Sequence, residues 1–298
     1  MFQKYKYVLT VYKERSFTNA AKRLFISQPS LSVAIQNIEK QLGAPLFERN
    51  NSAIKPTEIG LAYIATAEKI HCAEEEFKRR LTEINGLQTG KLVVGGSNYL
   101  SSDVLPQVIS RFRARFPGVE IVLTEANSTY LRQMLLREEV DLVIDNFDDT
   151  EHYELFPLTK EQILLCIPTT SGIQYNGTDQ LDYMDIIHFA DKPFVLLKSE
   201  NDMYRRAMDS FDGNGIVPNV VFSVDQLNIA YALTESGLGA CFLPDTFFKY
   251  RKRMANIALY KIKHKSAERT LYVGYKKGRY CTHAMAEFIR ITREMIGD

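Results

Sequence analysis

Histidines and cysteines are the residues of this sequence best able to carry covalent or metal chemistry, and their spacing suits neither. The five histidines stand apart from one another: His71, His152, His188, His264 and His283. The four cysteines, Cys72, Cys166, Cys241 and Cys281, form no CxxC pair and no metal-ligand spacing. No P-loop, strand-linked GxGxxG, HExxH or GxSxG motif occurs. We therefore expect a binding protein rather than an enzyme, with no cofactor and no metal.

Two of the cysteines lie in apolar runs, Cys166 in ILLCIP and Cys241 in GACFLP. Such runs are typical of buried strands, where a cysteine acts as a small apolar residue. We interpret both as core residues rather than redox sensors.

A helix predicted to begin after Ser27 presents short and amide side chains on one face. Its apolar residues recur at helical spacing: Leu31, Ile35, Ile38 and Leu42. Ser27 is placed to cap the first turn, which contains Pro29, and Gly43 ends the helix. The opposite face carries Gln28, Ser30, Ser32, Val33, Gln36 and Asn37. Such side chains suit base edges in a major groove, although an ordinary solvated face is the alternative.

The elements around this helix complete a small basic module. Residues 2–14 predict a helix with Tyr5, Val8, Leu9 and Tyr12 inward, and residues 18–25 predict a second with Ala20, Ala21, Leu24 and Phe25 on its apolar face. After the helix that follows Ser27, here called the recognition helix, comes a turn anchored by Phe47, here called the wing. It carries Arg49 and Lys55 beside a tip that begins at Asn50. These cations are placed to contact phosphates, with plain surface cations as the alternative.

Charge is distributed unevenly along the chain. Residues 1–57 contain nine Lys/Arg and three Glu, a net charge of +6, whereas the whole chain carries +1, which leaves −5 for the remainder. A basic N-terminal module joined to a mildly acidic body indicates a DNA-binding part followed by a part that does not bind DNA.

A long helix is predicted from Glu58 to Ile84, capped by Thr57. Its apolar residues follow a heptad pattern, for which we predict a dimerisation seam of Tyr63, Ile70, Phe77, Leu81 and Ile84. The helix measures roughly 42 Å, more than one small domain needs to cover its core. Packing only on its own domain is the alternative. Residues 85–90, NGLQTG, predict a hinge.

From residue 91 the pattern alternates between strands and helices, which predicts two similar α/β halves with parallel sheets. The expected strands cover residues 92–95, 120–125, 141–144, 163–168, 193–197, 220–224, 239–244 and 270–275. The expected helices cover residues 102–116, 129–138, 202–211, 226–235 and 282–296.

Polar residues follow four of these strands, where ligands bind in open α/β sheets. We predict an effector site of Ser97, Asn98, Tyr99, Asn127, Ser128, Asn146, Lys198, Ser199 and Asn201. Plain helix capping is the alternative. Hydroxyl and amide donors near helix N-termini suit a small metabolite with a carboxylate. Asp145 and Glu200 would oppose an anion if they face the site, so an amino acid or a cationic metabolite stays open.

Residues 2–60 resemble the DNA-binding domain of LysR-type transcriptional regulators. The resemblance rests on SFTNAAKRLFISQPSLSVAIQNIEKQLGAPLFER followed by PTEIG. The phrases DLVID (141–145) and ESGLGACFLP (235–244) are similar to the effector domain of that family, which is periplasmic-binding-protein-like. Many members carry arginines after SQPSLS and in the wing, where this sequence has residues 33–37 (VAIQN) and 50–53 (NNSA). This difference predicts a shallower salt dependence of DNA binding.

The predicted fold class is α+β and multidomain. It comprises a winged helix-turn-helix (1–57), a long linker helix with a hinge (58–90) and an α/β effector domain of two subdomains (91–298). Subdomain I covers about 91–161 and 266–298, and subdomain II about 162–265. Expected partners are double-stranded promoter DNA, a small-molecule effector, further copies of the chain and, for an activator, RNA polymerase. The resemblance implies a dimer or a tetramer of two dimers.

We expect a cytoplasmic protein without a membrane span, because neither a signal-peptide core nor a run of 18 apolar residues occurs. The alternative function is a solute-binding α/β domain whose N-terminal module serves assembly and binds no regulatory DNA.

Overall fold

The computed structural model describes residues 2–48, 54–84, 90–147, 149–171, 183–249, 251 and 256–297. The chain divides into two compact units, residues 1–84 and residues 85–298. No helix within these described ranges is long and apolar enough to cross a membrane.

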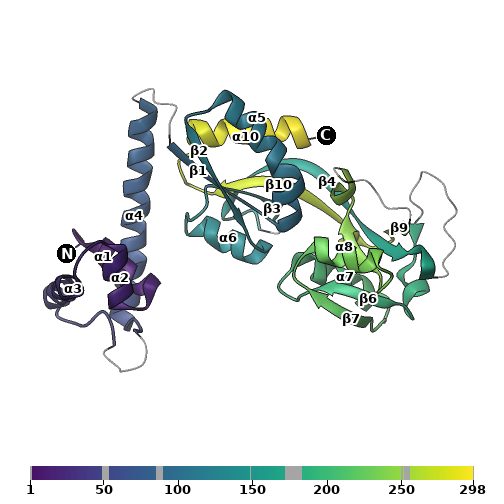
Figure 1. Ribbon diagram of the computed structural model, residues 1–298, viewed down its shortest axis with the longest axis horizontal. Helices are drawn as coiled ribbons and strands as arrows, with labels where there is room; N and C mark the ends of the chain where they lie inside the picture. Colours follow the sequence, from purple (N-terminus) through teal and green to yellow (C-terminus); the bar gives the residue numbers. More distant parts are fainter. Residues whose placement is uncertain are drawn as a thin grey trace. The chain divides into compact units, whose positions relative to one another are not determined.

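The first unit is a helical module built around one small core. Its helices are α1 (Tyr5–Glu14), α2 (Phe17–Arg23), α3 (Gln28–Leu42) and α4 (Glu58–Ile84) (Figure 1). Ser27 caps α3 as predicted, since its hydroxyl accepts a hydrogen bond from the Ser30 backbone N–H at 3.2 Å. Gly43 ends α3 at a φ of 73°, a left-handed conformation that favours glycine. The core gathers apolar residues of all four helices, among them Val8, Ala20, Leu31, Ile35 and Ala67.

Phe25 differs from the prediction. It follows the last turn of α2 at a φ of 55°, and its side chain is 96% exposed rather than buried on the apolar face. The left-handed turn breaks the helical period, so that Ile26 packs against the core instead. The Ile26 N–H donates to the Ala21 carbonyl at 3.1 Å and fixes this turn.

The helix α4 has the predicted bounds, but its two ends differ in environment. Tyr63 is 5% exposed and stacks on Phe2 with ring centroids 4.7 Å apart, and Ile70 is half-buried against the same core. Tyr63 is therefore unavailable to a second chain, contrary to its place in the predicted dimerisation seam. Phe77 and Leu81 are 61% and 42% exposed. The side chain of Ile84 lies outside the described part of the chain.

The second unit begins with a sheet in the order β2-β1-β3-β10-β4. β1 (Gly90–Gly96), β2 (Val119–Glu125) and β3 (Leu142–Asn146) are parallel, and β10 (Glu268–Lys276) runs antiparallel to β3 and to β4 (Tyr153–Pro168). The helices α5 (Leu105–Arg115) and α10 (His283–Ile296) cover one face, and α6 (Ser128–Leu136) covers the other (Figure 1).

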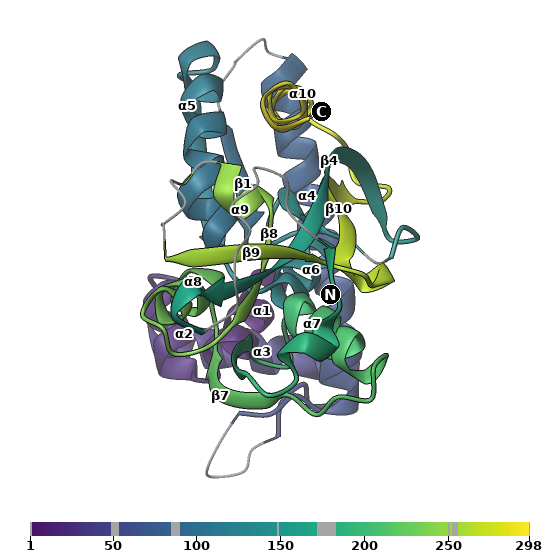
Figure 2. The same cartoon turned by 90° about the vertical axis from the view of Figure 1, so that its right-hand side faces the viewer.

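The strand β4 continues into a second sheet. Its residues 153–162 pair with β10, and its residues 163–168 pair with β8 (Cys241–Pro244) and β9 (Ile257–Ile262) (Figure 2). The remaining strands are β5 (Tyr183–Met184), β6 (Pro193–Leu197) and β7 (Asn219–Val224), of which β6 and β7 are parallel. The helices of this half are α7 (Asp202–Asp212), α8 (Leu227–Glu235) and α9 (Thr246–Lys249). Short helical turns cover η1 (Leu100–Val104), η2 (Thr169–Ser171), η3 (Ile186–Phe189) and η4 (Lys265–Ala267).

The expected parallel pairing is confirmed for β1, β2 and β3 and for β6 and β7, but β10 runs antiparallel to β3 and β4, which the sequence did not predict. The sequence also missed β5, β9 and the first ten residues of β4. Cys166 and Cys241 are buried in strands, as predicted, and they lie opposite each other in the register of β4 and β8.

Candidate functional site

One cleft of the second unit lies where parallel strands end. β1, β2 and β3 run in one direction, so the residues that follow them meet at one edge of the first sheet. β6 and β7 end at the other wall of the cleft. The cleft has a volume of about 180 Å³, and its lining comprises Ser97, Asn98, Tyr99, Glu125, Ala126, Asn127, Ser128, Asp145, Lys198, Glu200, Asn201, Met203, Asp225, Gln226, Leu227 and Arg269.

Seven of the nine residues predicted to bind an effector line this cleft, and Asn146 and Ser199 do not. Asn146 is buried at the end of β3, directly after the lining residue Asp145. The Asn146 side-chain oxygen accepts a hydrogen bond from Arg269 at 3.2 Å. Ser199 is exposed outside the lining.

Sequence reasoning missed the second set of lining residues, Asp225, Gln226 and Leu227, which follow β7. The pattern that found the other strand ends was present here too. The sequence prediction missed Arg269 for another reason. This residue lies inside a strand, and only the pairing of β10 with β3 and β4 brings it to the cleft.

Hydrogen bonds join the two walls of the cleft. The Gln226 amide donates to the Glu125 carboxylate at 3.2 Å, and the Thr129 hydroxyl donates to the Glu200 carbonyl at 3.2 Å. The Asn228 amide donates to the side-chain oxygen of Asn98. The two α/β halves are therefore held together by side chains that a ligand could displace or reinforce.

Asp145 is a buried ionisable group of the lining. It is 4% exposed, and its Oδ1 accepts hydrogen bonds from the Ser128 hydroxyl at 3.0 Å and the Asn146 N–H at 2.9 Å. Its Oδ2 is buried and has no hydrogen-bond partner among the described residues. Burial raises the pKa of this carboxyl to about 6, because a low-dielectric surrounding disfavours the charged form.

Arg269 lies at the centre of a buried charge network. Its guanidinium donates to Glu161 at 2.6 Å and to Asp202 at 3.2 Å, and all three side chains are at most 6% exposed. The Tyr99 hydroxyl also donates to Glu161, at 2.9 Å. Burial opposes the ionisation of Asp202, but Arg269 and Arg206 hold its pKa below the ordinary value. The network ties β10, β4 and α7 together beneath the cleft.

The first unit carries the predicted DNA-binding face on α3. Gln28, Pro29, Ser30, Val33 and Gln36 are exposed, and Ser32 is half-buried. The Gln28 amide donates to the Ser32 hydroxyl at 2.9 Å, one turn away. The apolar side of the same helix is buried in the core, so the polar face points to solvent.

The wing is described only in part. The Glu48 N–H donates to the Lys55 carbonyl at 2.8 Å, and Phe47 and Pro56 form an isolated antiparallel bridge at the base of the wing. Phe47 is buried, as predicted, and Lys55 is exposed. Arg49 and Asn50 lie outside the described residues, so their predicted phosphate contacts stay predictions.

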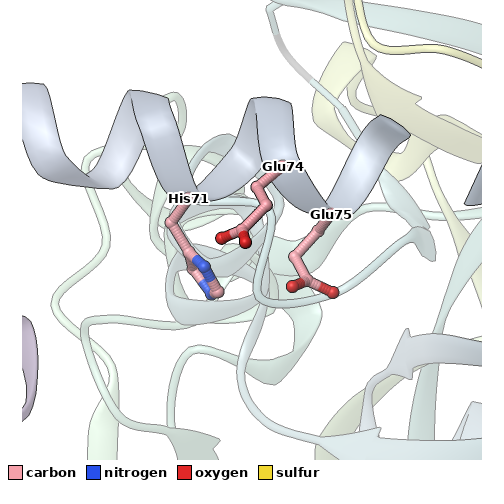
Figure 3. A group of neighbouring side chains, drawn as sticks. All are labelled: His71, Glu74 and Glu75. Carbon is pink, nitrogen blue, oxygen red and sulfur yellow. The ribbon is translucent and has the colours of Figure 1, made fainter. Parts of the chain in front are cut away.

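A group of His71, Glu74 and Glu75 on α4 has the residue types of a metal site (Figure 3). Its carboxylates already have partners. Glu74 accepts from the Tyr5 hydroxyl at 2.5 Å and pairs with Lys6 at 3.0 Å, and Glu75 pairs with Lys78 at 2.7 Å. Lys6 and Lys78 would repel a cation, so we interpret the group as a polar contact between α1 and α4.

Comparison with known proteins identifies both units. Residues 2–61 match the family model described as a bacterial regulatory helix-turn-helix protein of the lysR family, and residues 85–297 match the LysR substrate binding domain. The chain belongs to the LysR family of transcriptional regulators. The family match favours DNA-binding regulation over the solute-binding alternative.

Individual relatives of this LysR-family chain are distant. It is 27% identical to an uncharacterized HTH-type transcriptional regulator, YcgK of Bacillus subtilis, over 98% of this chain and 93% of the relative. It is 29% identical to a probable RuBisCO transcriptional regulator of Synechocystis sp., over 93% and 81%.

Among solved structures, CbnR in complex with its target DNA has a TM-score of 0.66 at 20% identity, covering 99% of both chains. A full-length OxyR variant from Pseudomonas aeruginosa has a TM-score of 0.70 at 21% identity, covering 99% of this chain and 94% of OxyR. At these identities the structures establish the shared fold of this LysR-family chain.

Proposed function

We propose that this regulator binds promoter DNA through the exposed face of α3 and that a small molecule in the cleft of the second unit controls this binding. The observation that carries the DNA-binding role is the solvent-facing side of α3, where glutamine and serine side chains stand free of the core. Amides of this kind pair bidentately with adenine. The sequence similarity to LysR regulators over both units supports the pairing of this face with an effector domain.

A gel-shift titration tests the DNA-binding face. We expect Gln28→Ala to weaken binding to the intergenic DNA upstream of the gene by roughly 1–3 kcal/mol, with little effect on unrelated DNA. Gln41→Ala is the matched control, because Gln41 is also exposed and lies near the far end of α3. Equal losses on both DNAs would show that Gln28 does not read bases, and no binding at low salt would remove the proposal.

We place the dimer contact on the end of α4 that carries Phe77 and Leu81. Their exposed apolar side chains lie four residues apart and therefore share one face. Two linked copies would present paired recognition helices to two half-sites. Sedimentation should show Phe77→Glu shifting the protein toward the monomer, whereas Leu136→Glu, at another exposed leucine on α6, should not. A tetramer, and contact with RNA polymerase if the protein activates, remain predictions from the family resemblance.

We infer that the effector acts by a population shift between arrangements of the two α/β halves. The bonds from Gln226 to Glu125 and from Thr129 to Glu200 span the cleft, so a ligand there changes what holds the halves together. Transmission through the segment at 85–90 stays a prediction, since residues 85–89 lie outside the described part. Promoter binding places the protein's work in the cytoplasm.

A further inference from the structure

The lining of the cleft carries more acidic than basic residues. The acids are Glu125, Asp145, Glu200 and Asp225, and the cations are Lys198 and Arg269. Lys198 pairs with Asp225 at 2.8 Å, and Arg269 is bonded to Glu161 and Asp202 beneath the cleft. Both cations in the described lining are therefore neutralised by carboxylates of the protein. A negatively charged ligand would meet unfavourable charge here.

Two of the helix N-termini at the cleft, those of α6 and α7, already carry carboxylates of the chain. Ser128, the first residue of α6, donates its hydroxyl to Asp145. Asp202 is the first residue of α7 and is buried against Arg269. Helix N-termini favour anions, and these two have been supplied with an anion from within the protein. At the N-termini of α6 and α7, Asp145 and Asp202 therefore take the place that a ligand carboxylate was expected to fill.

One oxygen of Asp145, a residue of the cleft lining, is buried and has no hydrogen-bond partner among the described residues. Ser128 and the Asn146 N–H both bond to Oδ1, and Arg132 forms an ion pair with Oδ2 at 3.8 Å, beyond hydrogen-bond distance. A carboxylate that is 4% exposed is costly to ionise unless a donor or a charge meets each oxygen. Oδ2 therefore lacks a donor that a ligand can supply.

Ser97 offers a second acceptor beside Asp145. Gly96 pairs with Ile144 in the parallel register of β1 and β3, so Ser97 and Asp145 follow at the same level of neighbouring strands. Adjacent strands lie about 4.8 Å apart, close enough for one ligand group to touch both residues. The Ser97 Oγ is buried and, like the Asp145 Oδ2, has no hydrogen-bond partner among the described residues.

We propose that the effector carries a protonated amine, which donates hydrogen bonds to the Asp145 Oδ2 and the Ser97 Oγ. An ammonium group has donors only and a positive charge, which complements two acceptors without hydrogen-bond donors in an acidic cleft. The proposal rests on the proposed function for the role of the cleft, and it replaces the carboxylate expected from the sequence. The volume of about 180 Å³ lies below the roughly 300–1,000 Å³ of pockets for drug-sized ligands. A simple amine and an amino acid share the required chemistry.

Calorimetric titration of the full chain tests this assignment. The probes are butylamine, 1,4-diaminobutane and L-lysine, matched by butyrate and succinate, each at up to millimolar concentrations. We expect at least one amine-bearing probe to bind the wild type. Binding of L-lysine alone would identify the effector as an amino acid. Binding of butylamine or 1,4-diaminobutane would identify it as a simple amine.

Two variants decide whether Asp145 holds the amine. Asp145→Asn should weaken amine binding at least about tenfold, because a charge-assisted hydrogen bond is lost. Asp191→Asn is the matched control at an exposed aspartate paired with Lys192, and it should bind like the wild type. A circular dichroism spectrum of each variant confirms that it is folded.

Three results would overturn the proposal: binding of the carboxylates alone, amine binding that Asp145→Asn leaves unchanged, or no binding of any amine-bearing probe. The proposed function fails differently. A protein that binds an amine but no promoter DNA would contradict the regulator role and leave the ligand class intact. A protein that binds promoter DNA and responds only to carboxylates would support the regulator role and contradict the proposed ligand class.

Discussion

Replacing Asp145 by asparagine should stabilise the second unit at neutral pH. Burial raises the pKa of the Asp145 carboxyl from 3.8 to about 6, so the folded state holds a proton more tightly than the unfolded chain does. Stability then falls as pH rises between these two values, and the full penalty is present above about pH 6. A shift of roughly two units corresponds to about 3 kcal/mol. Asparagine keeps an oxygen for the Ser128 and Asn146 donors and removes the buried charge. We therefore expect a gain of about 1–3 kcal/mol.

Differential scanning calorimetry of the full chain is the appropriate assay, because the two units can unfold in separate transitions. In a unit of this size each kcal/mol moves the midpoint by roughly 2–4 °C. The Asp145→Asn transition of the second unit should lie above the wild type at pH 7, and the difference should shrink toward zero as pH falls toward 4. Asp191→Asn, at a 75% exposed side chain, should show no such change. A variant that is less stable at pH 7, or a gain that does not depend on pH, would refute the reasoning.

Three further predictions concern other parts of the chain. Arg269→Met leaves the buried Glu161 carboxylate without its cation, whereas Asp202 keeps its ion pairs with Arg205 and Arg206, so calorimetry should show the second unit destabilised by about 3–5 kcal/mol; a near-neutral result would contradict the network. Ser27→Ala removes the cap of α3 and should lower the stability of the first unit by about 1 kcal/mol in the same scan, with Ser102→Ala, on the second unit, leaving that transition unmoved. Asn37→Arg should steepen the dependence of log K for DNA on log salt by about 0.9 for each added phosphate contact, and an unchanged slope would show that this face does not reach the backbone.

The sequence predicted the first unit well because its signals are local. Ser27 and Gly43 bound α3, Thr57 caps α4 through the Gly60 N–H at 2.9 Å, and helical spacing identified most of the core. The prediction that Phe25 is buried was wrong because the helical spacing of apolar residues in the sequence extends beyond the end of α2. Only the backbone conformation of the turn, a φ of 55°, reveals the break.

The cleft could be predicted in part. Polar residues that directly follow a strand can be recognised from the sequence pattern, and seven of the nine predicted residues line the cleft. The role predicted for Asn146 stays a prediction: its side chain lies outside the lining and accepts a hydrogen bond from Arg269, which is part of the lining. Arg269 reaches the cleft through the pairing of strands distant in sequence. Such long-range pairing leaves no local pattern.

The predicted seam on α4 illustrates a third limit. Heptad spacing marked Tyr63 and Phe77 alike, although the first packs inside its own domain and the second faces solvent. The pattern indicates an apolar face, and the fold of the neighbouring helices decides what covers it. Only the exposed part of that face is open to a second chain.

Effector-dependent DNA binding is the most direct test of the account. The measurement is the fluorescence anisotropy of labelled promoter DNA titrated with the full chain, with and without the amine probe that binds best. The wild type should change its affinity or its stoichiometry on the DNA when the amine is present, and Asp145→Asn should bind the same DNA without that response. Identical curves for the wild type with and without the amine would contradict the claim that occupancy of the cleft controls the recognition face of α3.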